Sequence, residues 1–255
     1  CHQAASIVEA LAGKVGWMKP NLGFYLKHGH EGIQALELLF KHMRTHAPDV
    51  VKILDLKAGD IGATNDTYAS FAYDVCGADA VTVHNYMGAQ AMAPWLDRGD
   101  KGVFVLTRTS NPGAEEFQKL DTCSSTLMGV TMEGFLYERV AQNVASLEGW
   151  NKRGNVGVVA GASPESIDDL ANVRRCVGEQ VPILIPGVGN KQGGDAAAAY
   201  QNGHNSQQAG IAINSSSGIT HAHDNQQYEG LAPAEASEAE ASNMHETIER
   251  VRLAA

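Results

Sequence analysis

The chain has 255 residues and a formal net charge of −10 at pH 7, and it contains no Lys- or Arg-rich run. This balance argues against nucleic acid and anionic membrane as main partners, and no apolar run approaches the ~20 residues that span a membrane. A hydrophobic content of 44% with 27 glycines is ordinary for a soluble α/β enzyme of one large or two small domains.

The four cysteines lie far apart, with neither a CxxC pair nor zinc-finger spacing. Reduced thiols in a cytoplasmic protein are the simplest interpretation. No signal peptide is visible, and the chain begins at Cys1 rather than Met. We therefore expect a trimmed or excised piece of a longer product.

Short apolar segments alternate with helical ones along the chain. The predicted strands, nearly all apolar as in sheets buried on both faces, cover residues 15–19, 51–55, 80–83, 102–107, 156–160, 183–186 and 210–214. The predicted helices cover residues 2–14, 24–45, 63–76, 89–96, 133–147, 164–176, 195–202 and 244–253. This alternation predicts parallel βα units.

Seven strands are one fewer than a (β/α)8 TIM barrel requires, and the chain opens directly on a helix. We expect one TIM-barrel domain over residues 1–255 whose first strand is missing upstream of Cys1. An open doubly wound sheet is the competing fold. It is less favoured because no Gly-x-Gly-x-x-Gly follows the early strands, and because polar residues cluster where the strands end.

Two segments break the rhythm of strands and helices. Residues 110–130 form a long polar connection, and such connections are often lids. Residues 229–243 are rich in Ala, Glu and Ser, which indicates a loop before the last helix. We expect mobile segments at 110–130 and 221–243.

The most informative segment, residues 55–61, reads DLKAGDI and directly follows an apolar run. In a strand, Asp55 and Lys57 share a face, and Asp60 lies past the strand end. Three charges packed there are costly unless function needs them. A solvated strand end is the plainer interpretation, but the continuation through Thr64 favours a functional site.

Other strand ends also carry polar or glycine-rich turns. Lys19 precedes Pro-Asn, Ser110 lies in Arg-Thr-Ser-Asn-Pro-Gly, and two glycine-rich turns span residues 186–194 and 214–218. Turns ahead of the last two barrel helices are where this fold often binds phosphate, through backbone N–H groups and helix dipoles.

These motifs together resemble orotidine 5′-monophosphate decarboxylase. The shared pattern is Asp55-x-Lys57-x-x-Asp60-Ile61-Gly62-x-Thr64, with the Lys19, Ser110 and Pro186 segments in the right order. The similarity runs over essentially the whole chain and is closest to the bacterial-type branch. The first segment alone is shared with sugar-phosphate decarboxylases and synthases of the same superfamily, whereas the combination with the Ser110 loop is more specific.

The resemblance implies a role for each matching residue. Lys19, Asp55, Lys57 and Asp60 form a catalytic Lys-Asp-Lys-Asp array, to which Asp60, Ile61 and Thr64 contribute from the partner subunit of a homodimer. The implied substrate-binding residues are Ile61, Thr64, Ser110, Pro186, Gly187, Gln192, Gly193, Ser217 and Gly218.

The implied reaction is decarboxylation of orotidine 5′-monophosphate to UMP, without metal or organic cofactor, in pyrimidine biosynthesis. Lys57 is expected to stabilise the carbanion left by CO2 and to protonate it. A like-charge contact between an enzyme carboxylate and the substrate carboxylate costs about 4 kcal/mol at ~4 Å and an effective dielectric of ~20, and it disappears as CO2 leaves. Both relief of this ground-state repulsion and stabilisation of the transition state are possible sources of the rate acceleration.

Three positions depart from the family pattern. Ser217 stands where the family has a phosphate-binding arginine, and Arg108 or Lys191 are conceivable substitutes. The turn before Gln192 is one residue longer. No residue matches the first-strand aspartate that orients Lys19.

Two alternatives follow from these observations. One is a Mg²⁺-dependent sugar-phosphate decarboxylase or synthase, which would need an acidic ligand where Lys19 stands. The other is a catalytically weakened nucleotide-binding homologue. His84 is interpreted as a structural strand-end residue, and the other nine histidines show no metal-ligand pattern.

Overall fold

The computed structural model describes residues 2–122, 125–127, 130–132, 134–146, 148–189 and 193–254, with side chains throughout except at 125–127 and 130–132. The strands are β1 Trp17–Met18, β2 Val51–Ala58, β3 Ala80–Val83, β4 Gly102–Arg108, β5 Ser125–Leu127, β6 Val130–Met132, β7 Val156–Ala160, β8 Ile183–Ile185 and β9 Ile211–Ile213. The α-helices are α1 His2–Leu11, α2 Leu22–Leu26, α3 Gly29–His46, α4 Gly62–Ser70, α5 Ala89–Leu96, α6 Glu115–Gln118, α7 Leu136–Ala145, α8 Ile167–Val177, α9 Ala196–Gly203, α10 Ser217–Thr220 and α11 Pro233–Ala254. A π-helix covers Phe71–Val75, and 3₁₀ turns cover Ala222–Asp224 and Gln226–Tyr228.

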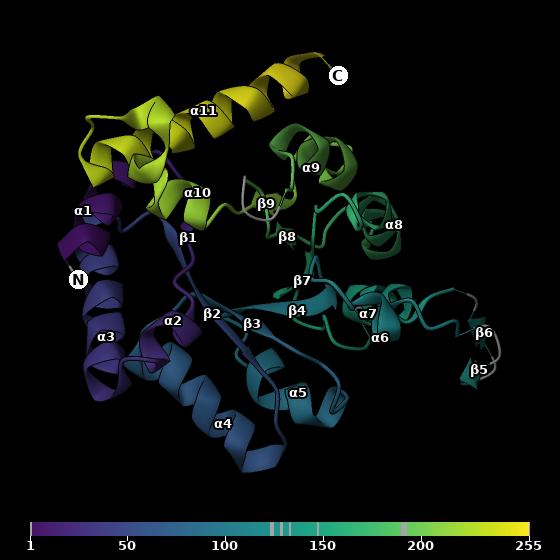
Figure 1. The fold of residues 1–255 in the computed structure, drawn as a ribbon. Helices are drawn as coiled ribbons and strands as arrows, with labels where there is room; N and C mark the ends of the chain where they lie inside the picture. The colour runs from purple at the N-terminus through teal and green to yellow at the C-terminus, as the bar shows by residue number, and fades with distance from the viewer. Residues whose placement is uncertain are drawn as a thin grey trace.

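Seven parallel strands form one sheet in the order β1-β2-β3-β4-β7-β8-β9. Consecutive strands pair with their neighbours, as in a barrel, and the helices lie around the outside (Figure 1). All seven predicted strands are confirmed. Among the described residues nothing pairs β1 with β9, so the barrel is open along this seam.

The main core lies between the strands and the surrounding helices, and it includes Phe40, Leu54 and Trp95. A smaller cluster lines the inside of the barrel, with Val159 and Leu184 packed among partly buried neighbours. Apolar side chains on both faces of each strand are the reason why the strand sequences lack the alternation of a half-exposed sheet.

The expected loop over residues 229–243 is wrong. Helix α11 begins at Pro233 and continues to Ala254, eleven residues before the predicted start of the last helix. Ala and Glu are strong helix formers, and Ala236, Ser237 and Ala241 bury one face of the helix. The helix packs on α1, α10 and α9 (Figure 1). It therefore connects the helices beside the two edge strands of the sheet, β1 and β9.

The single helix predicted over residues 24–45 is also wrong, because α2 and α3 are separate helices. Gly29 between them has a φ of 63°, which a residue with a side chain rarely adopts. A Cβ on Gly32 would lie 1.9 Å from the carbonyl oxygen of Tyr25, so the two helices meet where no side chain fits. In the part of the chain that the structure describes, no helix is both long and apolar enough to cross a bilayer.

Candidate active site

The carboxylate of Asp55, on β2, is the centre of the candidate site. Its Oδ2 accepts hydrogen bonds from Lys19 Nζ at 2.5 Å and Asn21 Nδ2 at 3.3 Å. Its Oδ1 accepts from Lys57 Nζ at 2.5 Å and from Thr82 Oγ1 at 2.8 Å. One buried carboxylate therefore holds two ammonium groups in place.

Strand pairing brings these groups together. Because β1 runs parallel to β2, the chain leaving β1 lies beside Asp55, whose N–H donates to the carbonyl of Pro20 at 2.8 Å. On the other side, β3 supplies Thr82, which also accepts the backbone N–H of Lys57 at 3.1 Å. Parallel pairing thus gathers residues that are far apart in the sequence at one edge of the sheet.

The two lysines differ in exposure. The side chain of Lys19 is 4% exposed, whereas that of Lys57 is 47% exposed. Burial by itself raises the pKa of Asp55, but the attraction of Lys19 and Lys57 outweighs it and lowers the pKa to about 2. Burial lowers the pKa of Lys19 in spite of Asp55. Asp55 is therefore ionised at neutral pH, with Lys19 enclosed behind it and Lys57 facing open space.

Lys57 has an unusual backbone conformation, with a φ of 47°. The pairing of β2 with β3 shifts register between Leu54 and Ala58, around this residue. Left-handed conformations of residues other than glycine persist only where the surroundings hold them, and they cluster at functional sites. Here Asp55 holds the side chain and Thr82 holds the backbone N–H.

Gly59 leaves room for a neighbouring imidazole. A Cβ at this position would lie 2.2 Å from the ring of His84, whose backbone N–H donates to the carbonyl of Ala58 at 2.9 Å. His84 therefore packs against the turn that follows Lys57. The glycine in the DLKAGDI segment is accounted for by this contact.

Asp60 lies apart from the two lysines. Its carboxylate accepts the N–H of Ile61 at 2.7 Å, and Asn65 binds its backbone N–H and carbonyl at 3.1 and 2.7 Å. The side chain of Ile61 is 62% exposed, and Thr64 is exposed as well. Asp60, Ile61 and Thr64 are absent from the lining of the barrel cavity. Within one subunit the structure brings Lys19, Asp55 and Lys57 together and leaves Asp60, Ile61 and Thr64 outside the cavity lining.

A cavity of about 2430 Å³ opens where the strands end and continues along the seam between β1 and β9. Among the residues predicted from sequence, its lining includes Lys19, Asp55, Lys57, Ser110, Pro186, Gly187 and Ser217. Gly193 and Gly218 are not part of this lining, and Gln192 and Lys191 lie outside the described residues.

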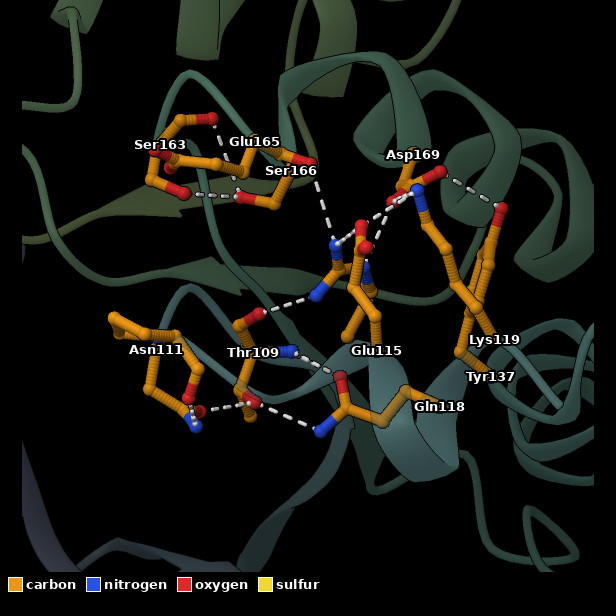
Figure 2. Close-up of polar contacts among 12 residues, drawn as sticks. Thr109, Asn111, Glu115, Gln118, Lys119, Tyr137, Ser163, Glu165, Ser166 and Asp169 are labelled. Carbon is orange, nitrogen blue, oxygen red and sulfur yellow. Dashed lines mark hydrogen bonds and ion pairs between the residues drawn. The ribbon is translucent and has the colours of Figure 1, made fainter.

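The turn that carries Ser110 is held from behind by a buried ionic network (Figure 2). Arg108, which is 2% exposed, donates to Asp169 at 2.7 Å and to the carbonyl of Thr109 at 2.7 Å. Lys119 reaches the same Asp169 at 3.1 Å. Arg108 is thus enclosed on the far side of the turn, and the hypothesis that it replaces the phosphate-binding arginine is wrong.

Ser110 itself lies close to β7, because a Cβ on Gly161 would be 2.6 Å from its Cβ. Gln118 of α6 receives the backbone N–H of Thr109 at 2.8 Å and donates to its hydroxyl, also at 2.8 Å (Figure 2). Contacts on both sides therefore fix the direction in which Ser110 enters the cavity.

The two glycine-rich turns meet where Gly189 lies beside Ser215. Gly187 has a φ of 87°, and a Cβ on Gly194 would lie 2.4 Å from the Gly187 carbonyl oxygen. A Cβ on Gly189 would lie 3.0 Å from the hydroxyl of Ser215. Ser215 Oγ is buried with no hydrogen-bond partner among the described residues, and Ser215 belongs to the cavity lining. A buried hydroxyl without a partner is costly, which suits a group that bonds a ligand.

Sequence reasoning missed three polar groups here. Thr82 is the one polar residue in the apolar segment Ala-Val-Thr-Val, and that contrast was a usable signal. Asn21 was visible beside Lys19 but was given no role. Ser215 lies within the glycine-rich turn at 214–218, and nothing in the sequence distinguishes it from its neighbours. The carboxylate of Asp55 is saturated by two ammonium groups, so this cluster does not suit a divalent cation.

Replacing Asp55 with Asn should lower the free energy of unfolding by about 3 kcal/mol or more at neutral pH, because Lys19 is left buried without a counter-charge. The folded-state pKa of Asp55 is depressed, so its stabilising contribution is complete above about pH 4 and is lost as pH falls toward about 2. The difference between wild type and variant in urea unfolding should therefore shrink over that interval. Asp49→Asn, at an exposed position, is the control. A difference that stays constant down to pH 2 would contradict this account.

Comparison with known proteins agrees with this geometry. The family model described as "Orotidine 5'-phosphate decarboxylase / HUMPS family" matches residues 2–229. An orotidine 5′-phosphate decarboxylase of Verminephrobacter eiseniae is 42% identical over 233 residues, covering 91% of this chain and 80% of the relative. One of Thermomicrobium roseum is 41% identical over 249 residues, covering 97% and 80%.

The structure of the Leishmania donovani OMP decarboxylase superposes with a TM-score of 0.80 at 30% identity, covering 100% of this chain and 88% of that one. The resemblance deduced from the sequence motifs is confirmed. The chain belongs to the orotidine 5′-phosphate decarboxylase / HUMPS family.

Proposed function

We propose that this protein decarboxylates orotidine 5′-monophosphate to UMP, the last step toward UMP in pyrimidine biosynthesis. The observation that carries the proposal is the carboxylate of Asp55 held between Lys19 and Lys57 at the cavity mouth. The relatives named above carry this activity in their names. The free thiols of Cys76 and Cys176 agree with a cytoplasmic location.

Lys57 is the proposed proton donor. Its ammonium is half-exposed to the cavity and fixed from one side by Asp55, so it can face C6 of the pyrimidine ring. As the C6–CO2 bond breaks, the electron pair stays on C6, and the ammonium stabilises it before delivering a proton to that carbon. Lys19, enclosed and bound to the other oxygen of Asp55, keeps the carboxylate from rotating.

The rest of the cavity suits the remaining parts of the nucleotide. Ser110 and Pro186 lie where they can contact the pyrimidine, and the paired glycine turns with Ser215 and Ser217 lie where they can bind the phosphate. Binding energy from the phosphate can hold the base against the lysine–aspartate cluster. Separate regions for phosphate binding and for chemistry are expected when the bond that breaks, C6–CO2, lies far from the phosphate.

A homodimer with shared active sites is part of the proposal. Asp60, Ile61 and Thr64 are absent from the lining of their own cavity, and the loop after β3 exposes Met87 at 51% and Tyr86, which is part of the cavity lining, at 83%. Apolar side chains this exposed on adjacent loops indicate a surface that a second subunit covers. Asp60 would then complete the cavity of the partner.

The alternatives find less support. A Mg²⁺-dependent sugar-phosphate enzyme needs an acidic ligand where Lys19 stands, and Lys19 is instead paired with Asp55. An experiment distinguishes an active decarboxylase from a catalytically weakened nucleotide-binding homologue. A UMP titration run beside a decarboxylation assay would show binding without CO2 release if that alternative held.

Replacing Lys57 with Ala should lower kcat by roughly 1,000-fold or more, because both charge stabilisation and the proton source are lost. UMP binding should persist, and the circular dichroism spectrum should not change. Lys101→Ala, on a different edge of the barrel, is the matched control. Turnover retained by the Lys57 variant would overturn the mechanism.

Mixing Lys57→Ala chains with Asp60→Asn chains should restore activity that neither variant has alone. If each site combines Lys57 of one subunit with Asp60 of the other, random mixing rebuilds roughly a quarter of the wild-type sites. The variants should be mixed after dissociation, and the activity followed with time. No recovery, with a dimer confirmed by light scattering, would exclude Asp60 acting across the interface.

Replacing Ser217 with Arg should lower KM for the phosphorylated substrate by roughly 10- to 100-fold, since one charge-assisted contact contributes about 1.5–3 kcal/mol. Ser206→Arg, exposed and outside the cavity lining, controls for added charge. An unchanged KM would mean that the phosphate is bound elsewhere.

A further inference from the structure

Three potential metal ligands meet on two helices outside the strand ends. Glu9 lies on α1, and His42 and His46 lie on α3. One ligand atom from each residue lies within 4.8 Å of the other two. The two histidines are four positions apart, so they lie on one face of their helix, and α1 packs along α3 (Figure 1).

The spacing of the first pair suits coordination of one ion. His42 Nε2 and Glu9 Oε1 are 3.1 Å apart. Two ligands bound to a tetrahedral Zn²⁺ at 2.0–2.1 Å are separated by about 3.3 Å. This ion-pair contact does not have hydrogen-bond geometry, and His42 Nε2 is buried with no hydrogen-bond partner among the described residues. The ring nitrogen and the carboxylate are close enough together to bind the same cation.

His46 is oriented as a ligand histidine usually is. Its Nδ1 lies 3.1 Å from the backbone carbonyl oxygen of His42. A ring N–H that donates to a carbonyl leaves the lone pair on the other ring nitrogen, which is the common arrangement around protein-bound metals. The rings of His42 and His46 are stacked, with centroids 3.9 Å apart, so the two imidazoles lie side by side on one face of α3.

We propose that Glu9, His42 and His46 bind a divalent transition-metal ion of the Zn²⁺ class. Two imidazoles and one carboxylate select zinc, copper or nickel over magnesium or calcium, which prefer all-oxygen sites. The remaining coordination position is open to water. The ion would tie α1 to α3 at the part of the cavity that His42 and His46 line, and it takes no part in the decarboxylation proposed above.

Isothermal titration of EDTA-treated protein with ZnCl2 near neutral pH tests the site. One ion per chain is expected. His42→Ala and Glu9→Gln should each weaken binding by at least ~10-fold. His30→Ala, at an exposed position on the same helix, is the matched control and should leave the affinity unchanged. Co²⁺ should give the intense visible absorption of a four-coordinate site in wild type and lose it in His42→Ala.

The midpoint of thermal unfolding, measured with and without Zn²⁺, shows whether Glu9 binds the metal or only packs between the helices. Zn²⁺ should raise the Tm of wild type and of His30→Ala but not that of Glu9→Gln, a conservative change that keeps the side-chain shape. Absence of binding, affinity unchanged in His42→Ala, or an equal loss in His30→Ala would each overturn the proposal.

Discussion

The buried ion cluster of Asp55, Lys19 and Lys57 is the constraint on which the rest of the site depends. A carboxylate that is 5% exposed would be unfavourable alone, and an enclosed ammonium beside it equally so. Together they are stable only while β1, β2 and β3 keep their pairing, because each strand or the turn after it contributes one donor or acceptor. The chemistry of the cavity is thus a property of the barrel rather than of any one segment.

The three groups are not equivalent. Lys19 is enclosed, so its charge serves to orient Asp55, while half-exposed Lys57 faces the space that a substrate would enter. The fixed charges need no reorganisation during the reaction, which is the main advantage of a preorganised polar site over water. Around them, the ionic network behind Ser110 and the close packing of the glycine turns hold two of the loops that line the cavity in place.

Much of this was accessible from the sequence, for identifiable reasons. Strands such as β3 and β7 are short apolar runs bounded by polar turns, and both were predicted with the bounds that the structure has. The charged residues of the DLKAGDI segment indicated the position of the candidate site. The first eleven residues of helix α11 were missed, because their composition resembles that of a disordered linker, although Ala and Glu favour helix.

Other features depended on tertiary contacts that no local pattern encodes. The partners of Arg108 lie on α8 and in the turn after β4, so its enclosure could not be read from its own neighbours. The spacing of His42 and His46 was visible, yet Glu9 lies on another helix, and the group was overlooked.

The left-handed backbone of Lys57 sets stability and catalysis against each other. Such a conformation costs a residue with a Cβ roughly 1–2 kcal/mol, whereas glycine adopts it freely. Laboratory evolution that rewards heat resistance alone would consequently favour glycine at this position, and the selected variants would lack the proton donor that we propose. Screens for robust variants of this enzyme must therefore couple survival to product formation.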